Sequence, residues 1–398
     1  MKLVLSLVGI VAILGLLWLL SWDRKRINWK LVLKAVIVQA ILAVLIVKVP
    51  VGQKLVTIAS NGVTAVVNCG KDGLSFVFGD LSDGSRFSVF IVQSLGGIIF
   101  VSALVNLLYY LGVIGFVVKW LGKAVGKLMG TTEVESFVAV ANMFLGQTSS
   151  PVLVSKYIRN LTDSEIFVIL VSGMGSMEVS ILAGYHACGI PMEYLLIASV
   201  LVPVGSILVS KMILPQSETA QSITDVKMDN KGNNSNVIDA IAEGAGTGMQ
   251  MVISIAASLV AIIGLVALMN MILGIAGISL EQIFSYLFAP FGFLMGLEGK
   301  DVLMEGALLG QKMILNEFVA FGDLGTIIAS LDPRTAMIAS ISLAGFANVS
   351  SLGICVSGIA VLCPEKKSTL SRLVLRAMLG GMLVSILSAM IVGVVALF

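Results

Sequence analysis

The chain has 398 residues, of which 58% are hydrophobic and only 12% are charged, and its formal net charge at pH 7 is +2. A soluble globular domain carries about 25% charged residues, so this composition excludes an ordinary soluble fold. The weak net charge, without a basic face carrying interleaved aromatic residues, also argues against a nucleic-acid partner.

Eight segments are long and apolar enough to cross a bilayer, since a spanning helix needs about 20 apolar residues. They are residues 3–21, 31–49, 88–117, 165–188, 192–211, 247–276, 334–362 and 371–397. The first lacks a basic leader and a small-residue cleavage site, so we expect a retained span and no signal peptide. Apolar segments broken by Gly, Pro or charge lie between the spans and suit interfacial or re-entrant helices: 50–79, 118–135, 136–160, 279–299 and 301–329.

The basic residues predict how these segments are threaded. Lys and Arg gather in five stretches that the positive-inside rule assigns to the cytoplasm: 24–30, 119–127, 156–159, 227–231 and 366–372. For these to share one face, 136–160 and 301–329 must each enter and leave on the same side. The predicted fold is therefore an all-α polytopic membrane protein with about eight transmembrane helices, two re-entrant hairpins and both termini outside.

A repeat lies on either side of the single long polar stretch, residues 216–237. One unit runs from Gln147 to Gly189 and the other from Glu317 to Gly358, and the two have nearly the same length. The first hairpin opens inward and the second outward, so the repeats are expected to be inverted, which is typical of secondary transporters with a midplane site. We therefore predict four parts. Residues 1–135 form N-terminal scaffold spans and interfacial helices, and residues 136–215 form repeat one. Residues 216–245 are a cytoplasmic linker, and residues 246–398 contain a scaffold span and repeat two.

Polar side chains at membrane depth are costly, which makes each one a functional hypothesis. The first hairpin contains Asn142, Gln147, Thr148 and Ser149, and the break at Pro151 leaves backbone groups free to bind a solute or a cation. Glutamine both donates and accepts hydrogen bonds, as recognition of a polar solute requires. The alternative, that the Ser and Thr residues only tighten helix packing, remains open.

Two carboxylates also lie in apolar runs. Glu317 must be paired, protonated or bound to a solute donor, unless it reaches water at a helix end. Glu178 is a candidate proton carrier, partner of a basic residue or solute-binding group. Asn348 and Ser351 follow a Gly-flanked stretch that suits an unwound helix lining a cavity, and Phe346 there is either a stacking ring or core packing.

Motifs for other mechanisms are missing from the sequence. It has no GxxxxGK[ST] loop for ATP, no HExxH, no GxSxG and no His/Cys cluster with metal-ligand spacing. We therefore expect a transporter driven by an ion gradient, with no cofactor and no enzymatic activity. A carrier for another small polar solute and, less simply, a channel remain as alternatives.

Several motifs together give a resemblance to a known family. Gly146-Gln147-Thr148, Asn316-Glu317-Phe318-Val319-Ala320, Gly345-Phe346-Ala347-Asn348 through Ser351 and Phe76-Val77-Phe78-Gly79 resemble signatures of the concentrative nucleoside transporters, in the family's order and over nearly the whole chain. The resemblance implies a multi-pass plasma-membrane protein, of bacterial type, that imports nucleosides with a coupling cation by alternating access. It also implies a homotrimer whose partners are its nucleoside and membrane lipid.

The resemblance carries residue roles with it. It implies that Gln147 and Thr148 face the nucleobase with Ile181 nearby, and that Phe346 flanks the site. Ribose hydroxyls would be bound by Glu317, Asn348 and Ser351. A sodium ion would be held by side chains of Asn142 and Ser176 and by backbone carbonyls of Leu145 and Met177, an oxygen-only shell that suits a hard cation.

Two positions depart from the family pattern. The family often has a carboxylate directly after Gln-Thr, where this chain has Ser149, and Glu178 falls where the family commonly has small residues. Glu178 could restore a negative group from the neighbouring helix, so the choice between purines and pyrimidines stays open. The retained Asn142 favours sodium over the proton as the coupling ion.

Overall fold

The computed structural model describes residues 2–84, 89–218, 226 and 234–398, and within these ranges the secondary structure is helical with no strand. Seven helices in the described ranges are long and apolar enough to cross a membrane. The prediction of an all-α polytopic membrane protein is confirmed, whereas the count of eight spans is not.

The N-terminal part consists of five helices, with a π-helical stretch, Ile91–Leu95, before the fourth. They are α1 (Lys2–Leu20), α2 (Trp29–Val47), α3 (Pro50–Phe78), α4 (Gly97–Tyr110) and α5 (Val113–Met129). Gly112, at φ 79°, separates α4 from α5. The predicted span 88–117 is therefore wrong at its end, and the segment 50–79, predicted as an interfacial or re-entrant helix, forms the single helix α3.

Repeat one begins with a helical hairpin. Its elements are α6 (Glu133–Leu153), α7 (Ser155–Ile158), α8 (Asp163–Gly175), α9 (Val179–Ala187) and α10 (Met192–Ile213). Thr132 and Thr162 each start a helix with a reciprocal capping box, to Glu135 and Glu165 respectively. The predicted span 165–188 is thus two half-helices, α8 and α9.

Repeat two follows two connecting helices, α11 (Val237–Leu273) and α12 (Leu280–Leu294). Its elements are α13 (Lys300–Ile314), α14 (Glu317–Ile327), α15 (Pro333–Ser342), α16 (Val349–Leu362) and α17 (Lys367–Val395). The predicted span 334–362 is interrupted between α15 and α16 by residues 343–348, a longer break than that between α8 and α9, and it is not among the seven long apolar helices. Helix α11 begins inside the predicted linker, and Lys227 and Lys231 lie outside the described residues.

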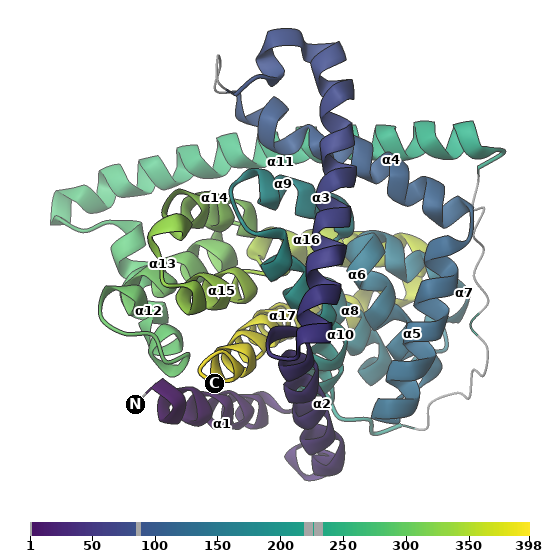
Figure 1. Cartoon of the computed structure of the whole chain (residues 1–398). Coiled ribbons are helices and arrows are strands. Elements are labelled where there is room, and N and C mark those ends of the chain that lie inside the picture. Colours follow the sequence, from purple (N-terminus) through teal and green to yellow (C-terminus); the bar gives the residue numbers. More distant parts are fainter. Residues whose placement is uncertain (1, 85–88, 219–225, 227–233) are drawn as a thin grey trace.

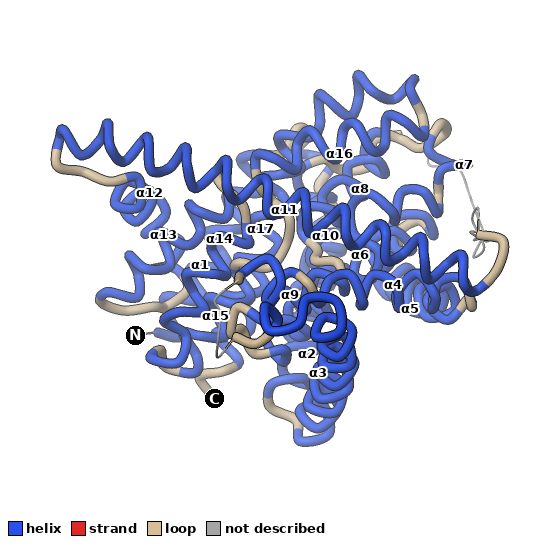
Figure 2. The backbone as a smooth tube through the Cα atoms, turned by 90° about the horizontal axis from the view of Figure 1, so that it is seen from above, coloured by secondary structure: helices blue, strands red, loops and turns tan. Residues whose placement is uncertain are grey.

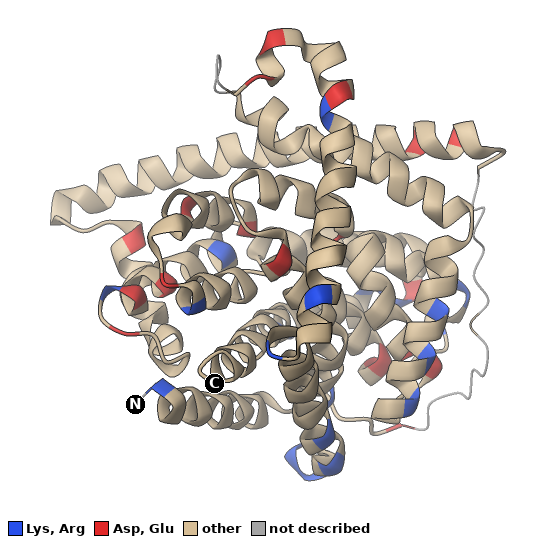
Figure 3. Cartoon of the chain, in the orientation of Figure 1, with Lys and Arg blue, Asp and Glu red and all other residues tan. Residues whose placement is uncertain are grey.

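One end of the bundle gathers most of the basic segments that were predicted to lie together. Trp22 N donates to the Ile213 carbonyl at 2.9 Å, Arg159 pairs with Glu365 at 3.0 Å, and Lys366 donates to the Leu161 carbonyl at 2.8 Å. Both ends of the first hairpin lie here, and Figure 3 shows charged residues concentrated near helix ends while the middle of α11 lacks them.

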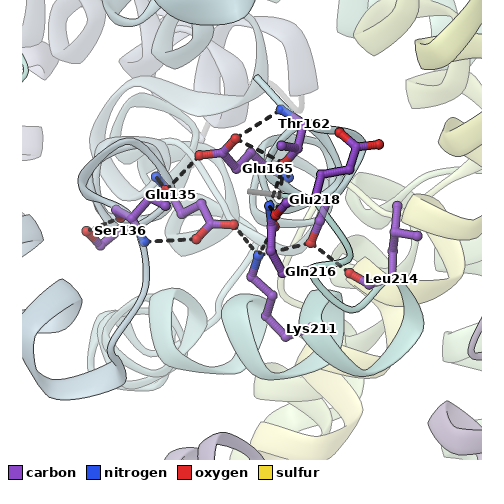
Figure 4. Close-up of polar contacts among 10 residues, drawn as sticks. Glu135, Ser136, Thr162, Glu165, Lys211, Leu214, Gln216 and Glu218 are labelled. Carbon is purple, nitrogen blue, oxygen red and sulfur yellow. Dashed lines mark hydrogen bonds and ion pairs between the residues drawn. The ribbon is translucent and has the colours of Figure 1, made fainter. Parts of the chain in front are cut away.

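A buried polar network anchors the first hairpin at this end (Figure 4). The Lys211 ammonium of α10 forms an ion pair with Glu135 of α6 and donates to Ser164 Oγ of α8 at 2.9 Å. Thr132 Oγ1 donates to Glu165 Oε1 at 3.0 Å, which links the starts of α6 and α8. Helices α6, α8 and α10 therefore share one buried charge cluster.

The opposite end of the bundle gathers the start of α1, the start of repeat two and the end of α17. Ser6 Oγ donates to the Met295 carbonyl at 2.9 Å, and Arg334 donates to the Gly393 carbonyl at 2.9 Å. Thr335 Oγ1 donates to Asp301 Oδ2 at 3.4 Å, so both ends of the second hairpin lie at this end. The two hairpins thus have their ends at opposite ends of the bundle, which is the arrangement expected of inverted repeats.

Helix α11 packs chiefly along α4 and runs across the outside of the repeats (Figures 1 and 2). A Cβ at Gly244 would lie 2.8 Å from Ala103 Cα, and one at Gly248 would lie 2.8 Å from Ile99 Cα. These glycines, four residues apart, let the two helix backbones approach closely, as small residues do in membrane proteins. Helices α4 and α11 therefore form a tightly packed pair.

Candidate functional site

Four helix interruptions meet at the centre of the two repeats. Gly146, at φ 71° and ψ −178°, kinks α6, and a Cβ there would lie 2.7 Å from Glu178 Oε2 in the break between α8 and α9. In the α15–α16 break, a Cβ at Gly345 would lie 2.7 Å from the Gly175 carbonyl oxygen. The fourth break, at Leu315, ends α13, and α14 begins at Glu317.

A cavity of about 230 Å³ lies between these breaks and α11. Ligand pockets are commonly about 300–1,000 Å³, so this cavity lies below that range and has room only for a small solute. Its wall comes from both hairpins, both broken helices and one face of α11: Gln147, Thr148, Glu178, Ile181, Met251, Ser254, Ile255, Ser258, Asn316, Glu317, Phe318, Phe346, Asn348, Ser350, Ser351 and Ile354.

The second-hairpin side of the cavity presents a carboxylate held in place by two donors. Glu317 is buried, and it accepts from Tyr185 Oη at 2.9 Å and from Asn348 Nδ2 at 2.8 Å. Asn348 Oδ1 in turn accepts from Ser351 N at 2.9 Å and Ser350 Oγ at 2.6 Å, which fixes the orientation of the amide. A carboxylate has about four acceptor positions, so Glu317 keeps unused lone pairs for a solute donor.

The first-hairpin side presents an amide and a second carboxylate. Gln147 Nε2 donates to Ser351 Oγ at 3.4 Å, and Gln147 Oε1 accepts from Cys355 Sγ at 3.1 Å. Glu178 Oε1 accepts from Ser180 Oγ at 2.6 Å. These contacts leave Glu178 with one oxygen, Oε2, beside the Gly146 backbone at the cavity edge.

The two halves of the site are related by the inverted repeat at a constant separation of 170 positions. Gly175 to Ser180 reads GSMEVS, and Gly345 to Ser350 reads GFANVS. The bond from Ser180 to Glu178 corresponds to that from Ser350 to Asn348, and both are 2.6 Å long. Likewise, the bond between Tyr185 and Glu317 corresponds to that between Cys355 and Gln147. Each hairpin is thus held by the broken helix of the other repeat.

An oxygen-rich group lies behind the first hairpin. Asn142 is fully buried, donates to Ser172 Oγ at 2.8 Å and accepts from Ser150 Oγ. Ser176 is buried and donates to the Gly173 carbonyl at 3.2 Å. The breaks also free backbone carbonyls at the predicted ligands Leu145 and Met177 from regular helical bonding. No cluster of three His, Cys, Asp or Glu suited to a metal occurs in the described ranges, so a cation here would rest on neutral oxygens.

Eight of the nine predicted solute-binding residues line this one cavity, and Ser149 does not. Ser149 is two positions beyond Gln147 in a helix with 3.6 residues per turn, so its exposed side chain points to another face. Sequence reasoning missed the contribution of α11, where Met251, Ser254, Ile255 and Ser258 recur at helical spacing. The available signal was the two serines in the otherwise apolar stretch 251–269.

Comparisons with known proteins agree over the whole chain. Family profiles described as "Na+ dependent nucleoside transporter" match residues 8–81 (N-terminus) and 194–393 (C-terminus), and one described as "Nucleoside recognition" matches residues 91–192. The uncharacterized transporter YutK of Bacillus subtilis is 37% identical over 99% of both chains. Nucleoside permease NupC of Helicobacter pylori is 34% identical over 98% of this chain and 96% of its own.

Solved structures give the same result. CNTnw in an inward-facing substrate-bound state is 35% identical, covers 99% of each chain and has a TM-score of 0.95. A CNTnw variant in an outward-facing state has the same TM-score.

Proposed function

The chain belongs to the family of Na⁺-dependent nucleoside transporters, and on that premise we propose that it imports nucleosides in symport with sodium by alternating access. The family consists of transporters, so the chain is a multi-pass plasma-membrane transporter and not an enzyme. The observation that carries the proposal is the single cavity where the breaks of both hairpins meet, with Glu317 and Gln147 on opposite sides.

The ribose binds on the second-hairpin side. Glu317 accepts hydrogen bonds from the sugar hydroxyls through the lone pairs that Tyr185 and Asn348 leave free. Asn348 and Ser351 complete the polar edge, and both are buried, so water competes weakly for these contacts. The arrangement recognises a diol and disfavours a solute without one, because the carboxylate would then stay buried without a donor.

The nucleobase binds on the first-hairpin side. Gln147 and Thr148 offer donors and acceptors for a base edge, Ile181 offers an apolar contact, and Phe346 a ring face. Glu178 lines the same wall, whereas Ser149 does not. We assign to Glu178 the acceptor role for base N–H groups, which favours bases that present a donor at that edge.

Sodium binds behind the first hairpin, to side chains of Asn142 and Ser176 and carbonyls of Leu145 and Met177. Asparagine and serine oxygens suit a hard cation and do not carry a proton between solutions, which supports sodium over the proton. An ion there bridges the kink of α6 and the α8–α9 break, so it orders the wall that contacts the base. Ion and nucleoside then bind cooperatively.

The moving part consists of the hairpins and broken helices, and the α4–α11 pair belongs to the scaffold. Met251 and Ser254 of α11 line the cavity although α11 packs chiefly on α4, so the cavity lies at the boundary between the two parts. In the membrane the hairpins are re-entrant, with the basic end of the bundle in the cytoplasm. Three copies assemble as a trimer through the scaffold.

Uptake into proteoliposomes tests the proposal. Labelled uridine, adenosine and guanosine are offered with an inward sodium gradient, with an inward proton gradient and with neither. Saturable accumulation that requires sodium is expected, and unlabelled nucleosides should compete while amino acids should not. Uptake that ignores both gradients would contradict symport, and linear uptake without competition would indicate a channel.

A further inference from the structure

A second buried lysine, Lys312 of α13, lies beside the α15–α16 break. Its side chain is fully buried, and Nζ donates to the Ser342 carbonyl at 2.9 Å, the Ala344 carbonyl at 2.8 Å and Ser385 Oγ at 2.8 Å. These carbonyls belong to the last residues before the interruption of the helix. The ammonium therefore binds the open end of a broken helix, where carbonyls carry partial negative charge.

The contacts require the charged form of Lys312. Two of its partners are carbonyls, which only accept, and Ser385 Oγ already donates its hydrogen to the Met382 carbonyl at 2.9 Å. All three bonds must be donated by Nζ, and only the ammonium has three N–H groups. The fully buried carboxylate of Glu305 accepts a hydrogen bond from Ser342 Oγ at 2.5 Å, so an anionic group contacts the residue whose carbonyl binds Nζ.

The inverted repeat gives this charge a counterpart in repeat one. At the separation of 170 positions, Lys312 corresponds to Asn142, and Ser342 corresponds to Ser172. The contact between Lys312 and Ser342 thus joins the same two positions as the bond from Asn142 to Ser172, although Lys312 binds the backbone carbonyl and Asn142 binds the side-chain hydroxyl. The proposed sodium ligand Ser176, however, corresponds to Phe346, which has no oxygen in its side chain. Repeat one has a set of neutral oxygens at this place, and repeat two has an ammonium instead.

We propose that Lys312 is a built-in cation, which fills in repeat two the position that the coupling ion takes in repeat one. The charge stays with the protein through the transport cycle, so each nucleoside moves with a single coupling cation. This inference rests on the cation site proposed above for repeat one. It makes Lys312 a positioning residue, since it holds the α15–α16 break and touches neither solute nor ion.

A purely structural lysine makes the same contacts, so the test must ask whether a free cation can replace it. Lys312→Asn gives repeat two the residue that repeat one has, next to the carboxylate of Glu305. Lys312→Met removes the charge without adding an oxygen. Lys211→Asn is the matched control, because Lys211 is another buried lysine but lies in the network at the bundle end.

The first measurement is the charge moved per nucleoside in wild-type proteoliposomes, from the membrane potential that stops uptake. One positive charge per nucleoside is expected, and two charges would overturn the proposal. For Lys312→Asn, the sodium dependence of uptake should steepen, with a Hill coefficient rising from about 1 toward about 2. An active Lys312→Asn variant with wild-type steepness would contradict it.

Thermal unfolding in detergent keeps the proposal testable if the variants do not transport. Raising sodium chloride against choline chloride should raise the Tm of Lys312→Asn more than that of the wild type, of Lys312→Met or of Lys211→Asn. Equal shifts in all four proteins would refute the built-in cation. Failure of wild-type nucleoside uptake would instead refute the proposed function, and the sodium-dependent Tm would still decide the role of Lys312.

Discussion

Replacing Glu317 with Gln removes a charge from the proposed ribose site while keeping the shape of the side chain. Asn348 cannot turn its amide, because its oxygen accepts from Ser351 N and Ser350 Oγ, so its Nδ2 must still meet an oxygen of residue 317. The new amide nitrogen then points to Tyr185, whose hydroxyl can accept as well as donate. The variant should fold, but it loses one acceptor that faces the cavity.

The size of the effect follows from the lost contact. A hydrogen bond to a charged group contributes about 1.5–3 kcal/mol. At about 1.4 kcal/mol for each factor of ten, the affinity for a ribonucleoside should fall about 10- to 150-fold. Because the loss concerns the hydroxyls, the affinity for a 2′,3′-dideoxynucleoside should fall much less.

Competition against labelled nucleoside measures both affinities in the wild type and in Glu317→Gln. The ratio of the affinity for the ribonucleoside to that for the 2′,3′-dideoxynucleoside should shrink at least about tenfold in the variant. Glu298→Gln, an exposed carboxylate paired with Lys2 at the bundle end, is the control and should keep the wild-type ratio. An unchanged ratio in Glu317→Gln would refute the assignment of this carboxylate to the ribose.

Three further predictions concern other residues. Glu178→Gln should change the relative affinities for purine and pyrimidine nucleosides by about 2- to 10-fold, the range of one ordinary hydrogen bond. Ser149→Ala should leave the competition between these nucleosides unchanged. The opposite pattern would assign the base contact to Ser149. Ser176→Ala should raise the sodium concentration for half-maximal uptake about tenfold, as expected for a lost ligand. Ser199→Ala, outside the site, should leave that concentration unchanged. The same sodium dependence in both variants would show that Ser176 is not part of the ion site. Lys211→Met should lower the free energy of unfolding by about 3–5 kcal/mol in reversible unfolding, because Glu135 is left as an unpaired buried charge. The double variant with Glu135→Gln should recover most of this lost stability. A double variant no more stable than Lys211→Met would mean that packing, and not charge, explains the loss.

Apolar periodicity and polar interruptions predicted much of the site from sequence. Gln147 and Glu317 stood out because a bilayer penalises such groups, and both line the cavity. The span predicted at 334–362 was counted as one crossing, but it is interrupted inside the stretch where Asn348 and Ser351 had indicated an unwound helix, with Gly345 at φ 101°.

Contacts between distant elements could not be predicted from the sequence. Ser254 and Ser258 look like packing residues of an apolar helix, and only the position of α11 beside the hairpins brings them to the cavity. Lys312 carried no prediction from the sequence, and only the fold shows that it is buried against the carbonyls of another helix. The two repeats were visible in the sequence, but the bonds that join them, from Tyr185 to Glu317 and from Cys355 to Gln147, could not be predicted from it.

Equilibrium binding to the purified protein tests the central claim most directly, because coupling through one site requires that ion and nucleoside stabilise each other. Nucleoside affinity is measured over a range of sodium concentrations, and sodium affinity with and without saturating nucleoside. Linkage requires both affinities to rise by the same factor, which is commonly about 5- to 150-fold. We predict such matching factors for sodium and none for potassium or choline, whereas nucleoside affinity that is independent of sodium would contradict the account.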